Sequence, residues 1–482
     1  MILRHARLLG SGDLVDVEVR DGRIAPAGSV TGTGTEVIDL DGRWLAPGLW
    51  DNHVHFTQWV RARQRIDLSA TTSPDEVLAV VAAELAARPD DGTAVVGYGF
   101  RDGLWPYPPT LAALDALAPH RPVILVSGDL HCGWINTRAA ASVGMVPDEF
   151  GLVREAEWMQ GQSRLGAETQ PLLEHFATAA EDAARRGVVG IVDFEATENV
   201  AEWPARVAAG IRSLRVEASI WPDRLAAAVA GGLRTGAVLD PDGLITVGRL
   251  KVVVDGSLNT RTALCHEPYP GLDPASPHAC GVQSFSPAEL RDLLETAYGN
   301  GITAAVHAIG DRANELVLDE YERLGVTGTV EHAQLVAATD FERFGRLGLV
   351  ASVQPEHAMD DRDVADRFWK GRTERTFAFR SLIDAGAALA LGSDAPVAPL
   401  DPWIAIAAAV GRDRDGREAW HPEQRIPFSV ALDASTRSRI AVGEPADLIV
   451  LDEDPSSLDS SALRGLPVAA TLLGGRWTWK SF

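Results

Sequence analysis

Eight short apolar runs, bounded by polar or glycine-rich turns, recur through the middle of the chain. Stretches with helical periodicity separate most of these runs, as residues 286–301 do. Alternation of buried strands with helices is typical of βα units around a parallel sheet. Eight such units predict a closed (β/α)8 barrel. The runs cover residues 48–56, 188–196, 214–221, 249–256, 302–311, 328–335, 348–357 and 389–396.

The two ends of the chain follow another pattern. The first 45 residues alternate polar and apolar positions between glycine turns, and residues 446–455 and 468–480 do the same. This alternation predicts strand–turn–strand segments. We therefore expect residues 1–45 and 438–482 to pair into one small β-sandwich domain, with the barrel in residues 46–437.

One apolar run, residues 122–134, does not fit the count of eight. It lies in the long stretch between the first two predicted barrel strands, residues 57–186. We interpret this stretch as an insertion that covers the barrel mouth as a lid. The expected fold class is therefore α/β: a TIM barrel with a terminal β-sandwich and a large insertion after the first barrel strand.

Composition and charge exclude several classes of protein. The 482 residues include 67 acidic and 44 basic ones, and the net charge of −23 disfavours nucleic acid or an anionic membrane as a partner. Cys132, Cys265 and Cys280 lack CxxC spacing, which argues against a disulfide framework or a thiolate zinc site. The charged N-terminus does not resemble a signal peptide, and no apolar run reaches the roughly 20 residues of a membrane helix. We expect a cytoplasmic protein.

Several predicted strands end in residues that commonly ligate metals. His53 and His55 share one face of the first strand, because side chains alternate along a strand. His307 ends the fifth strand, His332 the sixth and Asp394 the eighth. The carboxyl ends of barrel strands converge on the active site, so these side chains predict a divalent metal site. Imidazole and carboxylate ligands favour zinc, and manganese, iron and cobalt suit the same donors.

Each of these residues alone has a simpler explanation. A single strand histidine is usually a core residue, and Asp394 alone would serve as a helix cap. The prediction depends on their occurrence together at four of the eight strand ends.

Lys251 occupies the buried fourth run, RLKVVVDG. A buried lysine needs a partner, because its charge is costly to remove from water. An internal ion pair with Asp255 or Asp311 is one interpretation.

The sequence also resembles a known superfamily. The motifs PGLWDNHVHF, RRGVVGIVDFEA, LALGSDAP and GEPADLIVLDEDP resemble those of the amidohydrolase superfamily over nearly the whole chain. Within it, SGDLHCGWINTRAA, LKVVVDGSLNTRTA and VHAIGDRAN resemble the branch that includes N-substituted formamide deformylases. This resemblance implies a metal-dependent hydrolase of a non-peptide carbon–nitrogen bond, such as that of an N-substituted formamide or N-acyl compound. It also implies a small-molecule amide substrate and a homodimer.

The resemblance implies a second interpretation of Lys251. In binuclear members, carbon dioxide carboxylates a fourth-strand lysine, and the carbamate bridges two metals. His53, His55 and Asp394 would then hold one metal, and His307 and His332 the other. A metal-activated hydroxide would attack the amide carbonyl, and Asp394 would carry its proton to the leaving nitrogen.

Other polar residues are candidates for substrate binding. Asp129, His131 and Asn136 lie in the insertion motif SGDLHCGWINT, and His357 ends the seventh predicted strand. Stabilisation of the insertion is the alternative role for Asp129 and His131.

Two aspartates that follow strands, Asp255 and Asp311, are candidates for orienting the metal ligands through hydrogen bonds. Four aromatic residues are candidates for a pocket wall, although such residues more often pack in cores: Trp105, Tyr107, Trp134 and Trp369.

Three other functions stay open. A mononuclear aminohydrolase that deaminates a ring would share the fold, but such members usually carry HxxE on the fifth strand, where this chain has Gly310 in place of the glutamate. A non-catalytic scaffold would typically have lost metal ligands, and this chain keeps them. A lyase or isomerase could use the same ligands.

Overall fold

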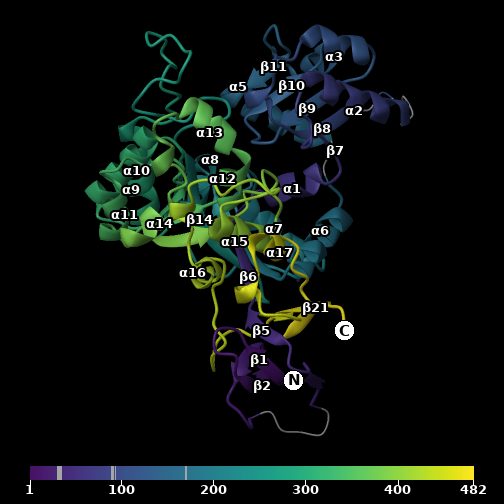
Figure 1. The fold of residues 1–482 in the computed structure, drawn as a ribbon, viewed down its shortest axis with the longest axis vertical. Coiled ribbons are helices and arrows are strands. Elements are labelled where there is room, and N and C mark those ends of the chain that lie inside the picture. Colours follow the sequence, from purple (N-terminus) through teal and green to yellow (C-terminus); the bar gives the residue numbers. More distant parts are fainter. Residues whose placement is uncertain (30–34, 88–91, 93, 169–170) are drawn as a thin grey trace.

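The computed structural model describes residues 1–29, 35–87, 92, 94–168 and 171–482. The chain forms a central barrel, an insertion at one end of it and a sheet that carries both termini at the other end (Figure 1).

The barrel is an eight-stranded parallel sheet in which the strands follow one another in chain order. A bridge between Val54 and Ala395 joins its first and last strands. This sheet confirms the predicted fold class and contains all eight apolar runs. Its strands are β6 (Leu49–Val54), β12 (Val188–Asp193), β13 (Arg215–Ile220), β14 (Ile245–Val253), β15 (Ala304–Ala308), β16 (Thr329–His332), β17 (Val350–Val353) and β18 (Ala388–Leu391).

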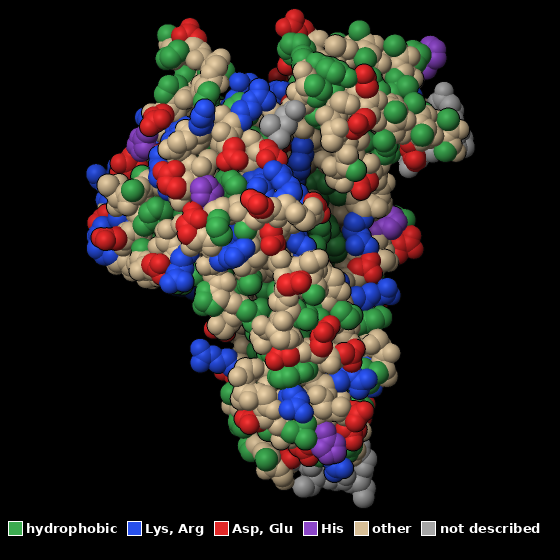
Figure 2. All heavy atoms as spheres, viewed as in Figure 1, with side chains coloured by type: hydrophobic (Ala, Val, Ile, Leu, Met, Phe, Trp, Pro, Cys, Tyr) green, Lys and Arg blue, Asp and Glu red, His purple; other side chains and the backbone are tan. Residues whose placement is uncertain are grey.

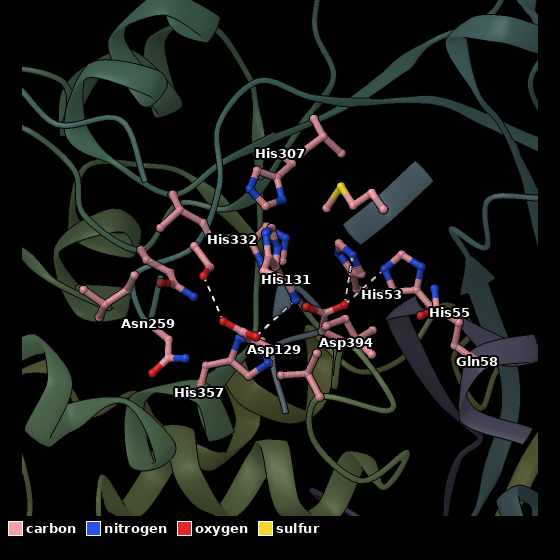
Figure 3. Close-up of a pocket in the computed structure, with 18 of the residues that line it drawn as sticks. His53, His55, Gln58, Asp129, His131, Asn259, His307, His332, His357 and Asp394 are labelled. Carbon is pink, nitrogen blue, oxygen red and sulfur yellow. Dashed lines mark hydrogen bonds and ion pairs between the residues drawn. The ribbon is translucent and has the colours of Figure 1, made fainter. Parts of the chain in front are cut away.

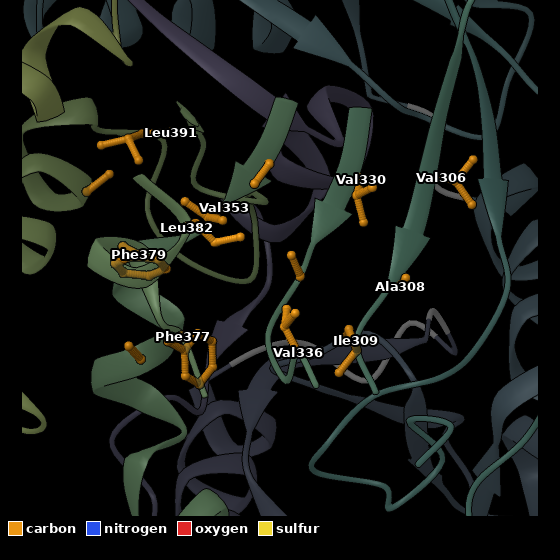
Figure 4. Packing of buried hydrophobic residues seen from close by; sticks show 14 of the residues in the cluster. Val306, Ala308, Ile309, Val330, Val336, Val353, Phe377, Phe379, Leu382 and Leu391 are labelled. Carbon is orange, nitrogen blue, oxygen red and sulfur yellow. The ribbon is translucent and has the colours of Figure 1, made fainter. Parts of the chain in front are cut away.

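Burial on both faces explains why these strands are continuous apolar runs. All six residues of β12 are buried. Gly190 in this strand accommodates Trp50, since an added Cβ would lie 2.3 Å from the indole. Figure 4 shows Val353 of β17 near Leu382 of α14, with Val330 on the neighbouring strand β16, all in one core cluster.

Helices follow most of the barrel strands. The helix predicted over residues 286–301 is α9 (Pro287–Gly299), which starts with a capping box between Ser286 and Glu289. The other helices after β12 are α7 (Asn199–Ala208), α8 (Pro222–Ala230), α10 (Asp311–Leu324), α11 (Phe341–Arg346), α12 (Pro355–Asp360), α13 (Arg362–Phe368), α14 (Phe379–Asp384), α15 (Pro402–Gly411), α16 (Phe428–Asp433) and α17 (Ser460–Arg464). Short 3-10 turns are η1 (Asp102–Leu104), η2 (Thr373–Arg375), η3 (Pro422–Gln424) and η4 (Pro455–Ser457).

The insertion has a sheet of its own, with the order β11-β10-β9-β8-β7. Val77 and Leu114 belong to a core on one side of it, and Val143 and Trp158 to a second core. Its strands are β7 (Ile66–Asp67), β8 (Val95–Phe100), β9 (Val123–Ser127), β10 (Cys132–Ile135) and β11 (Leu152–Arg154). Its helices are α1 (Phe56–Ala62), α2 (Pro74–Ala87), α3 (Leu111–Leu117), α4 (Thr137–Val143), α5 (Glu155–Glu168) and α6 (Leu173–Arg185). The unassigned run 122–134 is thus part of this sheet.

The two ends of the chain pair, as predicted, and they form one mixed sheet with the order β21-β20-β19-β5-β1-β2-β3 and β4 beside β1. Leu3, Leu45, Leu448 and Leu472 belong to its core. Its strands are β1 (Ile2–Leu8), β2 (Leu14–Arg20), β3 (Arg23–Ala25), β4 (Val37–Asp39), β5 (Trp44–Pro47), β19 (Leu448–Leu451), β20 (Ala470–Leu473) and β21 (Arg476–Lys480). The domain boundaries drawn from the sequence stay predictions.

The surface carries acidic and basic side chains in mixture on the face drawn in Figure 2. Within the described residues, each helix falls short of the length and apolar character that crossing a membrane requires.

Candidate metal centre

A pocket of about 210 Å³ lies at the carboxyl ends of the barrel strands, where the insertion meets the barrel. Barrel residues such as His53, Lys251 and Asp394 line it together with Arg101 and His131 of the insertion. In Figure 3 the labelled histidines and Asp394 surround one cavity. The structure therefore brings most of the predicted site residues to one place.

Three predicted ligands form the centre of this cluster. His53, His332 and Asp394 each offer a ligand atom, and these atoms lie within 4.8 Å of one another. Asp394 Oδ1 lies 3.5 Å from His53 Nε2 and 3.3 Å from His55 Nε2. The backbone N–H of Asp394 also donates to the carbonyl of His53 at 2.7 Å, which ties the end of β18 to β6.

Two of these residues have an unusual backbone. His332 and Asp394 have φ values of 75° and 58°, in the left-handed region that non-glycine residues rarely adopt. Such conformations are costly and concentrate at functional sites.

Hydrogen bonds orient two of the imidazoles. His53 Nδ1 donates to Glu331 Oε2 at 2.7 Å, and His332 Nδ1 donates to Gln354 Oε1 at 2.8 Å. A proton on Nδ1 leaves the lone pair of a neutral ring on Nε2. Both rings thus present the nitrogen that can bind a metal.

Burial favours the neutral form of these rings. Desolvation, with a contribution from the charge of Lys251, lowers the pKa of His53 to about 4. Desolvation and the neighbouring histidines also lower the pKa of His332 well below its ordinary value. Burial opposes the charge of Asp394, but His53, His55 and His332 outweigh burial and keep the pKa of this carboxyl well below its usual range. Neutral imidazoles beside an ionised carboxylate suit a divalent cation.

Lys251 lies inside the barrel, with 1% of its surface exposed. Its Nζ is 3.3 Å from His53 Nε2 and 4.6 Å from the centre of the Phe194 ring. Desolvation lowers the pKa of Lys251 to about 8. Neither Asp255 nor Asp311 forms an ion pair with Nζ among the described residues; Asp255 contacts His307, and Asp311 pairs with Arg375.

Asp255 and Asp311, both predicted to orient ligands, differ in position. Asp255 Oδ1 is 3.4 Å from His307 Nε2, and its carboxylate accepts N–H groups from the loop that follows β15. Asp311 instead accepts from the backbone of His266 and pairs with Arg375 at 3.0 Å. The bonds of Asp311 thus do not go to a predicted ligand.

The remaining predicted ligands flank the central three. The His307 ring centre is 4.4 Å from that of His332. His55 is 15% exposed and its Nδ1 is buried without a partner. The assignment of these residues to one metal or two stays a prediction.

The insertion contributes a second histidine–glutamate pair. His131 Nδ1 donates to Glu155 Oε2 at 3.0 Å. Burial opposes the charge of His131, but Glu155 outweighs it and raises the pKa of His131 to about 9. Asp129 accepts from Ser127 Oγ, the His131 backbone N–H and Ser257 Oγ, so it connects the insertion to the loop after β14.

Asn136 does not reach the pocket. Its Oδ1 accepts from the backbone of Val123 and Ala139, and its Nδ2 donates to the carbonyls of Ala118 and Arg121. All four hydrogen-bonding positions of the amide are occupied, and the residue caps α4. The structure therefore places Asn136 inside the insertion, away from the residues that line the pocket.

His357 does line the pocket, and its ring stacks with His332 at 6.3 Å between centres. The four suggested aromatic wall residues lie elsewhere. Trp105 and Trp134 pack in the core of the insertion, Trp369 packs in the barrel core, and Tyr107 is exposed. Trp221 contributes an indole to the pocket instead.

Sequence reasoning missed Glu331, Gln354, Glu155, Arg101 and Asp361. Glu331 had a usable signal, because a glutamate inside the apolar run TVEH needs a partner just as Lys251 does. The others lie in loops or at element ends, where neighbours in space cannot be derived from local pattern.

The chain is similar to known proteins over most of its length. Residues 36–478 match the model of the amidohydrolase family. The chain is 28% identical to the putative amidohydrolase YtcJ of Bacillus subtilis, over 97% of each chain. It is 26% identical to the N-substituted formamide deformylase of Arthrobacter pascens, over 95% of this chain and 94% of that one. It is also 29% identical to the protein LONG AFTER FAR-RED 3 of Arabidopsis thaliana, over 95% of this chain and 87% of that one.

A solved structure has the same fold. An uncharacterized metal-dependent hydrolase from Pyrococcus horikoshii superimposes with a TM-score of 0.78 at 24% identity, over 95% of this chain and 99% of that one.

Proposed function

The chain belongs to the amidohydrolase family, and on that premise we propose that it uses a divalent metal to hydrolyse a non-peptide carbon–nitrogen bond. N-substituted formamides and other N-acyl amines are the proposed substrates. One observation carries the proposal: ligand atoms of His53, His332 and Asp394 lie within 4.8 Å of one another in the pocket.

The donor set fits zinc, and manganese, iron or cobalt would suit it as well. Two imidazoles with Nδ1 held as a donor, together with an ionised carboxylate, are typical of such sites. When bound, the metal would supply an activated water at neutral pH and would polarise the substrate carbonyl.

We further propose that Lys251 is carboxylated. Its neutral amine would attack carbon dioxide, forming a nitrogen–carbon bond, while one C=O π pair moves to oxygen and one proton leaves to solvent. An ammonium cannot ligate a cation, whereas the carbamate offers two anionic oxygens. The lowered pKa of Lys251 and its distance from Asp255 and Asp311 support this proposal over an ion pair. His53, His55 and Asp394 would then hold one metal, and His307 and His332 the second.

Asp394 is the proposed proton carrier. Its ionised carboxylate lies next to His53 and His55, so it can accept the proton of the attacking water and deliver it to the leaving nitrogen. His131 and His357 line the same pocket and would contact the substrate.

A hydrolysis screen on the zinc- or manganese-loaded chain tests the proposal. The panel contains formamides, other N-acyl amines, N-acyl amino acids, cyclic amides and lactones. We expect turnover of a formamide or N-acyl amine, loss of activity on chelation and recovery with added metal. Two metals per chain would support the binuclear arrangement, whereas one would favour a mononuclear aminohydrolase.

The matched variants are His332→Asn in the pocket and His120→Asn, an exposed histidine of the insertion. Only the first should lose metal and activity. Absence of turnover across every amide class would overturn the proposed function.

A further inference from the structure

The pocket outside the metal centre is rich in hydrogen-bond acceptors. We propose that the protein prefers amides whose amine portion carries a positive charge, accepts neutral ones and rejects those that carry a carboxylate. This inference rests on the proposed function and narrows its substrate class. It depends on three acceptors in the pocket wall, Asp361, Asp129 and Gln334, and on the engagement of the wall's cations, Arg101 and His131, by other carboxylates.

Arg101 is already engaged. Its guanidinium donates to Asp360 Oδ2 at 3.0 Å and to the carbonyl of Val397 at 3.3 Å, and it lies 3.5 Å from Asp361 Oδ1. Recognition of a substrate carboxylate by arginine typically uses the free paired donors of the guanidinium. Here Asp360 and Val397 accept from Nη2, and Asp361 lies beside Nη1.

Asp361 lacks the close arginine partners that neutralise the neighbouring carboxylates. Asp360 is bound by Arg101 and also by Arg414 at 2.6 Å, and Glu356 pairs with Arg414 and Arg464. Asp361 has only the long contact to Arg101 among the described ion pairs. Burial accordingly raises the pKa of the Asp361 carboxyl to about 7, which is the direction expected of a carboxylate short of positive partners.

Asp129 adds a second unpaired charge. Two hydroxyls and a backbone N–H donate to it, yet no described cation lies within 4 Å of its carboxylate. His131 offsets this charge only in part, because its ring is hydrogen-bonded to Glu155 and not to Asp129.

Gln334 supplies a neutral acceptor. Its side chain lines the pocket, the residue is 3% exposed, and Oε1 is buried without a hydrogen-bond partner. Leaving such an atom unpaired is costly, so an N–H donor of a ligand would be stabilised there. Leu258, Ile309 and Met159 provide apolar surface for an alkyl chain between the scissile bond and the charge.

The carboxylates of the pocket determine whether a cationic or an anionic substrate is preferred. A substrate carboxylate would be desolvated beside two carboxylates with no free cation, whereas an ammonium would find Asp361 and Asp129 ready to pair. The cavity of about 210 Å³ suits compact substrates, since a cavity of roughly 150 Å³ holds benzene.

The test uses the formyl and acetyl derivatives of three amines of similar length: putrescine, pentylamine and γ-aminobutyrate. These place a cation, a methyl group and a carboxylate at the far end. We expect kcat/KM to fall in that order, with about tenfold between the cationic and the neutral member, as for a hydrogen-bonded charge pair. Asp361→Asn should remove most of that preference.

The matched control is Asp363→Asn. It removes the same charge two residues further on, at a surface ion pair with Arg417 outside the pocket, and should leave the preference unchanged. The inference fails if the carboxylate derivative is cleaved as well as the putrescine derivative, or if Asp361→Asn leaves their ratio intact.

Thermal-shift titration with the same compounds separates this failure from failure of the proposed function. It measures binding even where no amide is cleaved. Stabilisation that is largest with the putrescine derivatives and smaller with the pentylamine derivatives would support the inference, and equal stabilisation by the γ-aminobutyrate derivatives would overturn it.

Discussion

Two buried histidines, one on the barrel and one on the insertion, each donate Nδ1–H to a glutamate, yet their pKa values shift in opposite directions. His53 bonds Glu331 at 2.7 Å and has a pKa of about 4. His131 bonds Glu155 at 3.0 Å and has a pKa of about 9.

The two pKa values differ because the side chains differ in burial and in the other charges that lie near them. His53 is completely buried and has Lys251 Nζ at 3.3 Å, so desolvation and a nearby positive charge both oppose protonation. Burial also opposes the charge of His131, but Glu155, with help from Asp129 and Asp394, outweighs it. The same hydrogen-bonded pair thus produces a neutral imidazole suited to a metal in the barrel and an imidazolium in the insertion.

The largest effect is expected from Lys251→Ala, which removes the amine whose Nζ lies 3.3 Å from His53 Nε2. If the lysine is a carbamate ligand, metal content and activity should fall together, with activity reduced about a thousandfold or more, and short carboxylates plus metal should restore part of it. Metal analysis and initial rates measure both.

The chain has three lysines, so Lys370→Ala is a direct control. Retention of two metals and full rate by Lys251→Ala would contradict the carbamate.

A smaller effect is expected from Glu331→Gln. The amide can still accept from His53 Nδ1, but the ring loses the charge that raises its basicity as a ligand. We expect metal affinity to fall about 10- to 100-fold, the range found for partners of metal-bound histidines. Competition with a chelator measures the affinity, with the exposed Glu342→Gln as control. Unchanged affinity would mean that Glu331 only fills the barrel interior.

Glu155→Gln tests the His131–Glu155 pair through the pH dependence of stability. The pKa of His131 is raised in the folded state, so the stability contributed by the pair is present below about pH 6.5, the ordinary histidine value, and is lost as pH rises through about 9. The difference in melting temperature between the native protein and Glu155→Gln should shrink over that window. Denaturation scans from pH 6 to 10 measure it, with Glu157→Gln on the same helix as control. A constant difference would contradict the raised pKa of His131.

The smallest effect on activity is expected from Asn136→Ala. The variant should lose about 1 to 2 kcal/mol of stability, because it removes a helix cap and leaves buried backbone groups unpaired. Its KM should stay unchanged, since Asn136 lies away from the pocket. Chemical denaturation and steady-state kinetics check the two parts, with exposed Asn300→Ala as the control. A raised KM with unchanged stability would contradict this prediction and support a role for Asn136 in substrate binding.

The candidate ligands were accessible to sequence reasoning because strand ends are local features. A (β/α)8 barrel brings the carboxyl ends of its strands together whatever its loops do. His53, His307, His332 and Asp394 therefore needed only the strand count and their position within each strand. Asp129 and His131 were predicted from the insertion motif and the interpretation of the insertion as a lid, and both line the pocket.

Residues whose role depends on a distant partner were not accessible in this way. Glu331 lies 278 positions from His53, and only the closed barrel brings the two side chains together. Asn136 and His131 lie in one motif, yet the Asn136 amide bonds within the insertion, whereas the His131 ring lines the pocket.

By itself the sequence determined the barrel, the terminal sheet, the insertion and the types of residue at the strand ends. These follow from hydrophobic periodicity, which each segment carries within its own few residues. Only the tertiary structure decided which histidine is neutral, what Lys251 faces and which acceptors in the pocket lack a cation. Protonation and ion pairing depend on burial and on charges a few ångströms away, and those neighbours come from distant parts of the chain.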